Sequence, residues 1–160
     1  MMGIIKNYNV TLLFIASVVA LSVAYIAQYL FGMLPCKLCL YERIPYFINI
    51  GLFVVYLFKP SKIVFFVMCL CYMCNIFISG YHVALEHGWV ADIVGCTDNA
   101  QSLSFDDIKN SLLDVNVVVS CARPSVVFMG LSIAECNLIY CVLCFTLGIH
   151  LFVKQYVTGK

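Results

Sequence analysis

Long apolar runs separated by short polar stretches dominate the chain. The first run, 10–31, lies within 30 consecutive uncharged positions. Three more follow at 44–58, 63–85 and 125–153, and the second reaches spanning length only if the turn 40–43 starts it. A helix that crosses a bilayer needs about 20 predominantly apolar residues. The pattern predicts an all-α integral membrane protein with four transmembrane helices, at about 10–31, 40–58, 63–85 and 128–153.

The fourth run contains a single acidic residue, Glu135. An ionisable side chain at mid-membrane is costly and usually functional. If the helix starts near Leu131, Glu135 lies about one turn inside it and can reach the interface. We prefer this interpretation, because 131–153 already supplies 23 residues.

Basic residues near the predicted helix ends indicate the orientation. On one side of the membrane lie the two chain termini and the turn 59–62, which are short and rich in lysine. On the other side lie the loops 35–43 and 86–124. The positive-inside rule therefore places both termini in the cytoplasm and both loops outside. The first apolar run exceeds the roughly 7–15 residues of a signal-peptide core, so we expect a retained helix within a single domain, 1–160.

Composition supports a membrane protein and excludes other classes. Hydrophobic residues make up 64% of the 160 residues and charged residues 11%, so the apolar excess must face lipid. The same figures exclude a disordered chain. A formal net charge of +1 supplies no basic surface for a nucleic-acid partner.

Ten cysteines are divided between the loops and the spans. Cys36 and Cys39 lie in the short outer loop, and Cys96 and Cys121 lie in the long one. The other six lie within spans three and four: Cys69, Cys71, Cys74, Cys136, Cys141 and Cys144. In a bacterium, the outer face is the oxidising periplasm, where disulfides persist.

The pair Cys36-Lys37-Leu38-Cys39 is predicted to begin the second helix. The unpaired amides and positive end of a helix favour a thiolate, and Lys37 and Arg43 add positive charge. Cys39 and Arg43 are four residues apart, so they share a helix face and the guanidinium can lie near whatever the sulfur reacts with. The alternative is that Arg43 only anchors the span at the interface.

The span cysteines include two further pairs with the same spacing, Cys71/Cys74 and Cys141/Cys144. They lie among apolar residues with no nearby cation, so we interpret them as packing residues. A copper or zinc site is the alternative. His82 lies near the outer end of the third span and His150 near the inner end of the fourth, too far apart along the membrane normal to share one ion, and we predict no metal site.

The long outer loop contains a predicted short amphipathic helix at about 104–115. Ser104 and Asp107 have capping-box spacing, and Phe105, Ile108 and Leu112 share one side. This helix would lie on the membrane surface or pack against the ends of the spans. The loop is long enough to carry one cysteine to a soluble partner and another to Cys36 or Cys39.

The segment Cys36-Lys-Leu-Cys39-Leu-Tyr-Glu-Arg43 resembles the Cys-x-Leu-Cys-x-Tyr-Glu/Gln-Arg signature of the DsbB family of bacterial inner-membrane quinone reductases. Tyr81-His82 with Glu86, the second cysteine pair, and the run 128–134 are also similar to the family pattern. At 125–127 many relatives have a tryptophan that is absent here. The span cysteines are not part of the family pattern.

The resemblance implies a mechanism. Cys96 would exchange with a reduced periplasmic DsbA-like thioredoxin-fold protein, and Cys121 would pair first with Cys96 and then with Cys36. Cys39 would thereby be freed as a thiolate beside a membrane quinone, ubiquinone or menaquinone, and disulfides would be made de novo. Arg43 would bind the quinone carbonyl, and His82 is either a second residue of that pocket or an interfacial histidine.

Three other classes remain as alternatives. An enzyme similar to vitamin K epoxide reductase also uses quinone and two cysteine pairs, but its membrane pair comes late in the chain, whereas here the pair comes first. A metal transporter would use the span cysteines and would not need Cys36 and Cys39. A purely structural membrane protein would tolerate the loss of both loop pairs.

Overall fold

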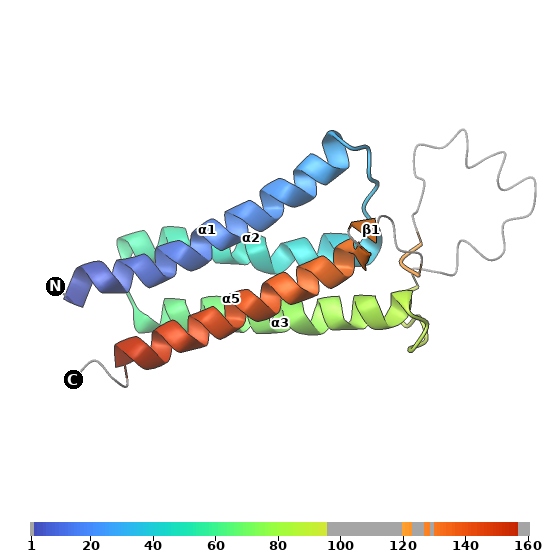
Figure 1. Ribbon diagram of the computed structural model, residues 1–160. Helices are drawn as coiled ribbons and strands as arrows, with labels where there is room; N and C mark the ends of the chain where they lie inside the picture. The colour runs from blue at the N-terminus through green and yellow to red at the C-terminus, as the bar shows by residue number, and fades with distance from the viewer. Residues whose placement is uncertain (1, 96–119, 123–126, 129, 157–160) are drawn as a thin grey trace, which may run out of the picture.

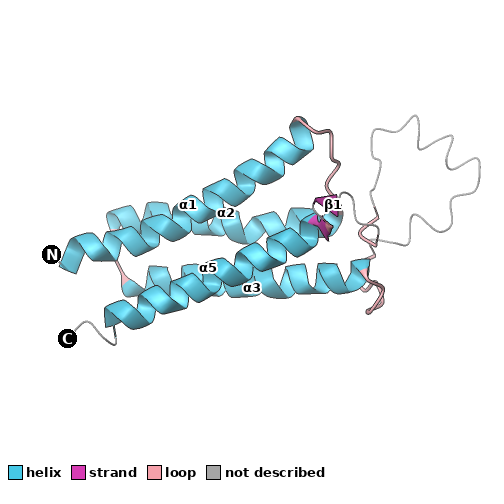
Figure 2. Ribbon diagram, viewed as in Figure 1, coloured by secondary structure: helices cyan, strands magenta, loops and turns pink. Residues whose placement is uncertain are grey.

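The computed structural model describes residues 2–95, 120–122, 127–128 and 130–156. Within these residues four long helices run side by side (Figures 1 and 2). They are α1 (Met2–Tyr29), α2 (Lys37–Phe58), α3 (Lys62–Glu86) and α5 (Ile133–Tyr156). Each is long and apolar enough to cross a membrane. The predicted four-helix membrane fold is confirmed.

Caps and glycines set the helix ends. α1 stops shortly before Gly32, whose φ of +66° no regular helix accommodates. α2 starts at Lys37, three residues before the predicted span 40–58, because Cys36 Sγ accepts the backbone N–H of Cys39 and caps the helix. Ser61 caps α3 through the N–H of Ile63.

α5 starts at Ile133, two residues after the preferred start near Leu131 and five after the first residue of the approximate span 128–153. An antiparallel hairpin precedes it, formed by β1 (Val127–Phe128) and β2 (Leu131–Ser132) around Gly130 at φ +87°. Ser132 Oγ accepts the Glu135 N–H at 3.1 Å, and Glu135 Oε2 accepts the Ser132 N–H at 2.7 Å. This reciprocal capping box begins the helix. It places Glu135 in the first turn, in agreement with the preferred interpretation.

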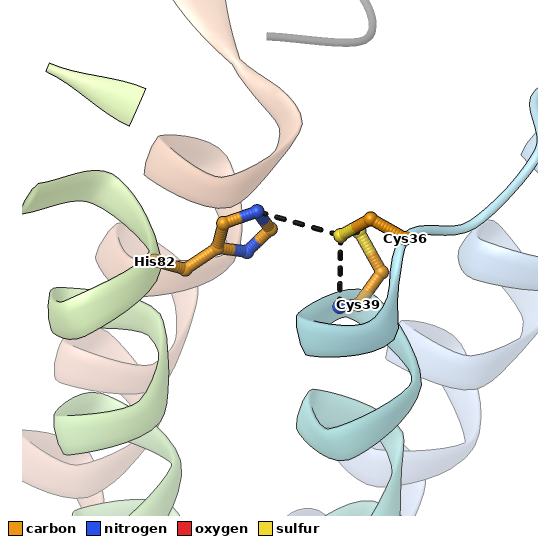
Figure 3. Close-up of side chains that lie close together, drawn as sticks. All are labelled: Cys36, Cys39 and His82. Carbon is orange, nitrogen blue, oxygen red and sulfur yellow. Dashed lines mark hydrogen bonds between the residues drawn. The ribbon is translucent and has the colours of Figure 1, made fainter. Parts of the chain in front are cut away.

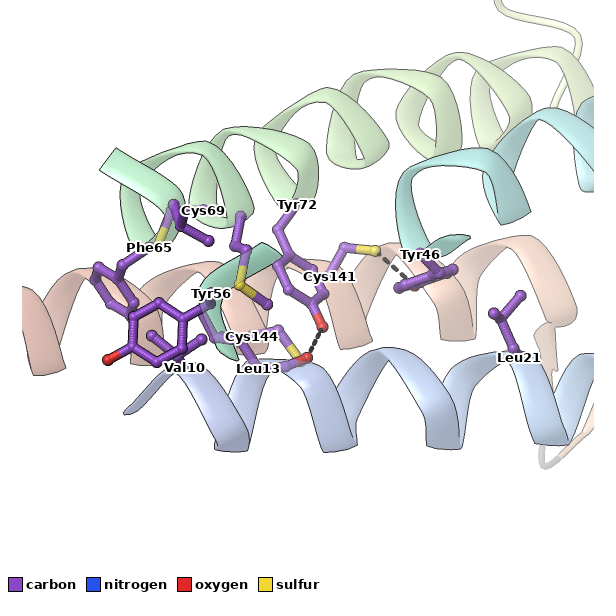
Figure 4. Packing of buried hydrophobic residues seen from close by; sticks show 12 residues of the cluster. Val10, Leu13, Leu21, Tyr46, Tyr56, Phe65, Cys69, Tyr72, Cys141 and Cys144 are labelled. Carbon is purple, nitrogen blue, oxygen red and sulfur yellow. Dashed lines mark hydrogen bonds between the residues drawn. The ribbon is translucent and has the colours of Figure 1, made fainter. Parts of the chain in front are cut away.

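The core lies between the four helices, all of which contribute side chains to it (Figure 4). α3 packs against both α2 and α5, and α1 packs mainly against α2. Leu13, Met68 and Tyr72 are fully buried there. The Tyr72 hydroxyl donates to the Leu13 carbonyl at 3.0 Å, so a buried polar tip is satisfied. Apolar side chains such as Phe77 also cover the outside of the bundle, as expected of a surface that faces lipid.

The six span cysteines occupy ordinary packing positions. Cys69, Cys141 and Cys144 belong to the buried core cluster. Cys71 and Cys136 are half-buried, and Cys74 is exposed on the outside of α3. This distribution fits small apolar residues that fill space between helices.

The two ends of the bundle differ. α1 begins and α5 ends at one end, and α1 diverges from α5 toward the other (Figure 1). We call this other end the site end; it holds the first turn of α2, the last turn of α3 and the hairpin. The predicted loop helix at 104–115 and Cys96 lie outside the described residues.

Candidate active site

Cys36 and Cys39 lie together at the first turn of α2 (Figure 3). Their Sγ atoms are 3.0 Å apart, with Cys36 as the donor. The Cys39 backbone N–H donates to Cys36 Sγ at 3.2 Å. Cys36 is only 2% exposed, and Cys39 is half-buried. A small side-chain movement can therefore join the two sulfurs as a disulfide.

The environment of Cys36 keeps its thiol protonated. The hydrogen bond that Cys36 donates to Cys39 and the burial of its sulfur both raise the pKa of Cys36 above its ordinary value. Cys39 is the sulfur that receives this hydrogen bond. A donated S–H stabilises a thiolate, so the arrangement suits Cys39 as the nucleophilic or electron-donating sulfur of the pair.

His82, from the last turns of α3, lies beside this pair. Its Nε2 is 3.6 Å from Cys36 Sγ (Figure 3). Its Nδ1 is 2.8 Å from Glu42 Oε1. Because a carboxylate only accepts hydrogen bonds, Nδ1 carries the hydrogen. In the neutral ring Nε2 is then an acceptor that faces the thiol. The geometry allows His82 to take up a thiol proton while Glu42 holds the resulting charge.

The second oxygen of Glu42 is held from α5. Asn137 Nδ2 donates to Glu42 Oε2 at 3.1 Å and to Ser79 Oγ at 2.7 Å. The Asn137 carbonyl oxygen accepts the Tyr46 hydroxyl at 2.7 Å. Glu42 is 6% exposed, and a carboxylate this deeply buried needs such partners. The network joins α2, α3 and α5 directly beneath the cysteine pair.

A second set of contacts joins the end of α3 to the start of α5. Ser132 Oγ donates to Glu86 Oε2 at 2.6 Å, and His87 Nε2 lies 2.9 Å from Glu135 Oε1. Glu86 Oε1 in turn is 3.8 Å from His82 Nε2. These contacts tie the last turn of α3 to the start of α5.

Arg43 points toward α1. Its Nη1 donates to Gln28 Oε1 at 2.7 Å, and its guanidinium lies 5.0 Å from the centre of the Tyr25 ring. A guanidinium has five donor hydrogens, so this bond leaves donors for another acceptor. Lys37, the other predicted cation, donates to the Gly95 carbonyl at 3.0 Å.

A wholly apolar cavity of about 470 Å³ lies on the other side of α2, against α3. Its lining residues are Leu38, Tyr41, Ile44, Pro45, Phe77, Ile78, Tyr81 and Val94. Neither the cysteine pair nor Arg43 contributes to this lining. A ligand that is hydrogen-bonded to Arg43 would therefore not lie in this cavity.

Cys121 lies close to the first pair despite its distance in sequence. It is 1% exposed and packs in one buried cluster with Cys36, Leu38 and Leu85. Cys96 lies outside the described residues, but its neighbour Gly95 is tied to Lys37 beside the pair. The described ends of the long loop thus meet at the site.

The structure brings together Cys36, Cys39, His82 and Cys121, while Arg43 makes its contacts on the α1 side of α2. Sequence reasoning gave no role to Asn137 or Gln28 and placed Glu42 only beside Arg43, in the family signature and as a possible interfacial anchor. In the structure Glu42 and Asn137 hold His82, and Gln28 holds Arg43. The available signal was that all three are polar residues in or next to an apolar run. Nothing in the sequence said which partner each one faces.

These features define the class of protein: a multi-pass membrane protein whose helices hold a buried dithiol. Comparisons identify the family. A family model described as "Disulfide bond formation protein DsbB" matches residues 6–151. The chain is also 35% identical over 154 residues to "Uncharacterized protein RP370" of Rickettsia prowazekii (strain Madrid E), covering 92% of this chain and 88% of that protein. No solved structure matches.

The chain therefore belongs to the DsbB family and is a disulfide-bond-forming membrane thiol oxidoreductase.

Proposed function

We propose that the protein reoxidises a periplasmic DsbA-like thioredoxin-fold protein and passes the electrons to a membrane quinone, ubiquinone or menaquinone. The observation that carries the proposal is the buried cluster of Cys36 and Cys121, with Cys39 against it. It joins a cysteine of the long loop to the pair at the helix start. A loop cysteine packed against the helix-start pair provides a path for thiol–disulfide exchange.

The loop cysteines, Cys96 and Cys121, exchange disulfides with the partner protein. A Cys96–Cys121 disulfide takes two electrons from the partner's dithiol, which leaves as a disulfide. The pair Cys36–Cys39 also starts as a disulfide: the Cys121 thiolate freed by the partner attacks Cys36 and releases Cys39 as a thiolate. When the partner's second thiol has displaced Cys96, Cys96 re-forms its disulfide with Cys121, and Cys36 and Cys39 are left reduced. The burial of Cys121 beside Cys36 and the tether of Gly95 to Lys37 both support this route.

The pair at the start of α2, Cys36 and Cys39, passes the electrons to the acceptor. Two electrons leave Cys36 and Cys39 as their sulfurs join, and two protons leave with them. His82 Nε2, 3.6 Å from Cys36 Sγ, accepts a thiol proton, and Glu42 balances the charge of the ring. Glu42 and Asn137 act as positioning residues, because they hold the ring and do not touch the sulfurs.

The residues around Arg43 fit a quinone ring. A quinone supplies an acceptor that takes up two electrons and two protons, and its carbonyls need hydrogen-bond donors. Arg43 offers donors beyond the one given to Gln28, and it lies on the same helix as Cys39, one turn further on. Tyr25 provides an aromatic surface next to the guanidinium.

We further propose that the protein lies in the bacterial inner membrane with both termini cytoplasmic and the active cysteines periplasmic. The lysine-rich tails and the 59–62 turn support this orientation. The start of α1 and the end of α5 lie at one end of the bundle and the cysteines at the other (Figure 1). A single orientation in the membrane therefore places the termini on the cytoplasmic side and the cysteines on the periplasmic side.

The proposal is tested by following quinone absorbance after a reduced DsbA-type protein is added to the purified protein in detergent. We expect turnover that disappears in Cys39→Ala. The matched control is Cys71→Ser/Cys74→Ser, which removes a pair of the same spacing from α3 and should leave turnover unchanged. Quinone that stays oxidised while a known quinone reductase works in the same assay would overturn the proposal.

A further inference from the structure

We propose that the reduced site is also a Zn²⁺ site, in which Cys36, Cys39 and His82 are the ligands. Among the described residues these three form a group whose donor atoms all lie within 4.8 Å of one another. Two are thiol sulfurs and one is an imidazole nitrogen, the donor types that Zn²⁺ prefers. The binding depends only on this geometry, whereas the inhibition described below rests on the proposed function.

The distances are close to those of a tetrahedral zinc centre. With Zn–S of about 2.3 Å and Zn–N of about 2.0 Å, tetrahedral ligands are separated by about 3.8 Å for two sulfurs and about 3.5 Å for sulfur and nitrogen. His82 Nε2 is already 3.6 Å from Cys36 Sγ. The two sulfurs, 3.0 Å apart, must separate by about 0.8 Å, which a rotation of the half-buried Cys39 side chain achieves.

His82 is prepared as a ligand. Glu42 Oε1 accepts the Nδ1 hydrogen at 2.8 Å, and this leaves the Nε2 lone pair directed at the sulfurs. Zinc-binding histidines almost always donate their second nitrogen to such a carboxylate or carbonyl group. Asn137 fixes the carboxylate in turn at 3.1 Å, so the ring orientation exists before any ion arrives.

Charge and burial also favour the ion. Two thiolates balance Zn²⁺, so the complex formed by the three ligands is neutral and compatible with a site where Cys36 and His82 are 2% and 3% exposed. Two groups border the site and can complete the coordination. Glu86 Oε1 is 3.8 Å from His82 Nε2, and Cys121 packs against Cys36.

Binding is limited to the reduced protein. Zn²⁺ displaces the two thiol protons to the solvent, and no electrons move. A disulfide between Cys36 and Cys39 offers no thiolate and cannot bind the ion in this way. Zn²⁺ therefore traps the dithiol and competes with its oxidation, so the ion acts as a reversible inhibitor of the proposed reaction.

The test is a Zn²⁺ titration of the full-length reduced protein in detergent, without quinone or partner, read by competition with a chromogenic chelator. We expect about one tight Zn²⁺ per chain and release of about two protons. Cys39→Ser and His82→Gln should weaken binding by about tenfold or more, and Glu42→Gln by about tenfold. Cys71→Ser/Cys74→Ser is the control and should bind as the unaltered protein does.

Two results would overturn the proposal: no tight binding to a protein whose thiols are shown to be free, or equal affinity in Cys39→Ser. If the variants fail to fold, the test is the absorption spectrum of Co²⁺ bound to the unaltered protein. Tetrahedral d–d bands with thiolate charge transfer are expected, and an octahedral spectrum without charge transfer contradicts the site. Zinc binding without any quinone reduction would leave this site intact and refute the proposed function instead.

Discussion

The buried carboxylate of Glu42 provides the sharpest test of how the site works. In Glu42→Gln an acceptor remains for the His82 Nδ1 hydrogen, but the charge is lost. In Glu42→Leu two donors lose their carboxylate acceptor: His82 Nδ1, now 2.8 Å from Glu42 Oε1, and Asn137 Nδ2, now 3.1 Å from Glu42 Oε2. The two substitutions therefore separate the effect of charge from the effect of orientation.

The expected magnitudes follow from these two hydrogen bonds. A bond to a charged acceptor contributes about 1.5–3 kcal/mol and a neutral one about 0.5–1.5, so Glu42→Gln should cost about 1 kcal/mol, or about a fivefold loss of rate. Glu42→Leu loses the whole charged bond to His82, and this corresponds to about a 10- to 150-fold loss. Because Glu42 makes no contact on the Arg43 side of α2, the KM for quinone should stay the same in both variants.

The assay is steady-state quinone reduction, normalised to folded protein, with kcat and KM measured separately. Glu135→Gln is the control, because that carboxylate contacts His87 and the start of α5 instead of His82. It should alter stability and leave kcat unchanged. A Glu42→Leu variant within twofold of the unaltered kcat, or a loss confined to KM, would refute the role assigned to the Glu42–His82 pair.

Three further predictions concern other contacts. Cys36 should resist alkylation by iodoacetamide between about pH 7 and pH 9, since burial and its hydrogen bond to Cys39 raise the pKa of its thiol. Cys39→Ala removes that hydrogen bond and should speed the alkylation of Cys36, and an unchanged rate measured by mass spectrometry would contradict this. Gly148→Ala should destabilise the bundle by about 1–3 kcal/mol, because its Cβ would lie 2.9 Å from Cys69 Sγ. Adding Cys69→Ala should restore the unfolding midpoint in detergent, and a midpoint that stays low would show that the clash is elsewhere. Ser132→Ala removes the cap of α5 and should cost about 0.5–2 kcal/mol in the same unfolding measurement; an unchanged midpoint would argue against the capping box.

Several features could be predicted from the sequence because they depend on local patterns. The apolar runs gave the four helices, and the positions of Cys36 and Cys39 at a helix start followed from the change in polarity before 40–58. Glu135 was expected in the first turn of the last helix, where its carboxylate lies. The hairpin before that helix was not predicted, because a single glycine within a mostly apolar run does not identify the turn at Gly130.

The contacts that organise the site depend on packing and could not be predicted in this way. Glu42 and His82 are 40 residues apart, and Glu42 and Asn137 are 95 apart. Hydrophobic periodicity is weak in helices that are apolar on every face, so it does not show which side of a helix is interior. His82 was expected either in the quinone pocket or as an interfacial histidine, and the sequence gave no sign of its contacts with Cys36, Glu42 and Glu86.

The central claim is that the Cys36–Cys39 dithiol itself reduces quinone. It is tested most directly in a single turnover: fully reduced protein is mixed anaerobically with about one equivalent of a short-chain ubiquinone, without any partner protein, and the new disulfide is mapped by mass spectrometry. The account predicts loss of the quinone absorbance in proportion to the protein, with the disulfide between Cys36 and Cys39. Quinone that remains oxidised, or a disulfide formed instead between Cys71 and Cys74, would contradict it.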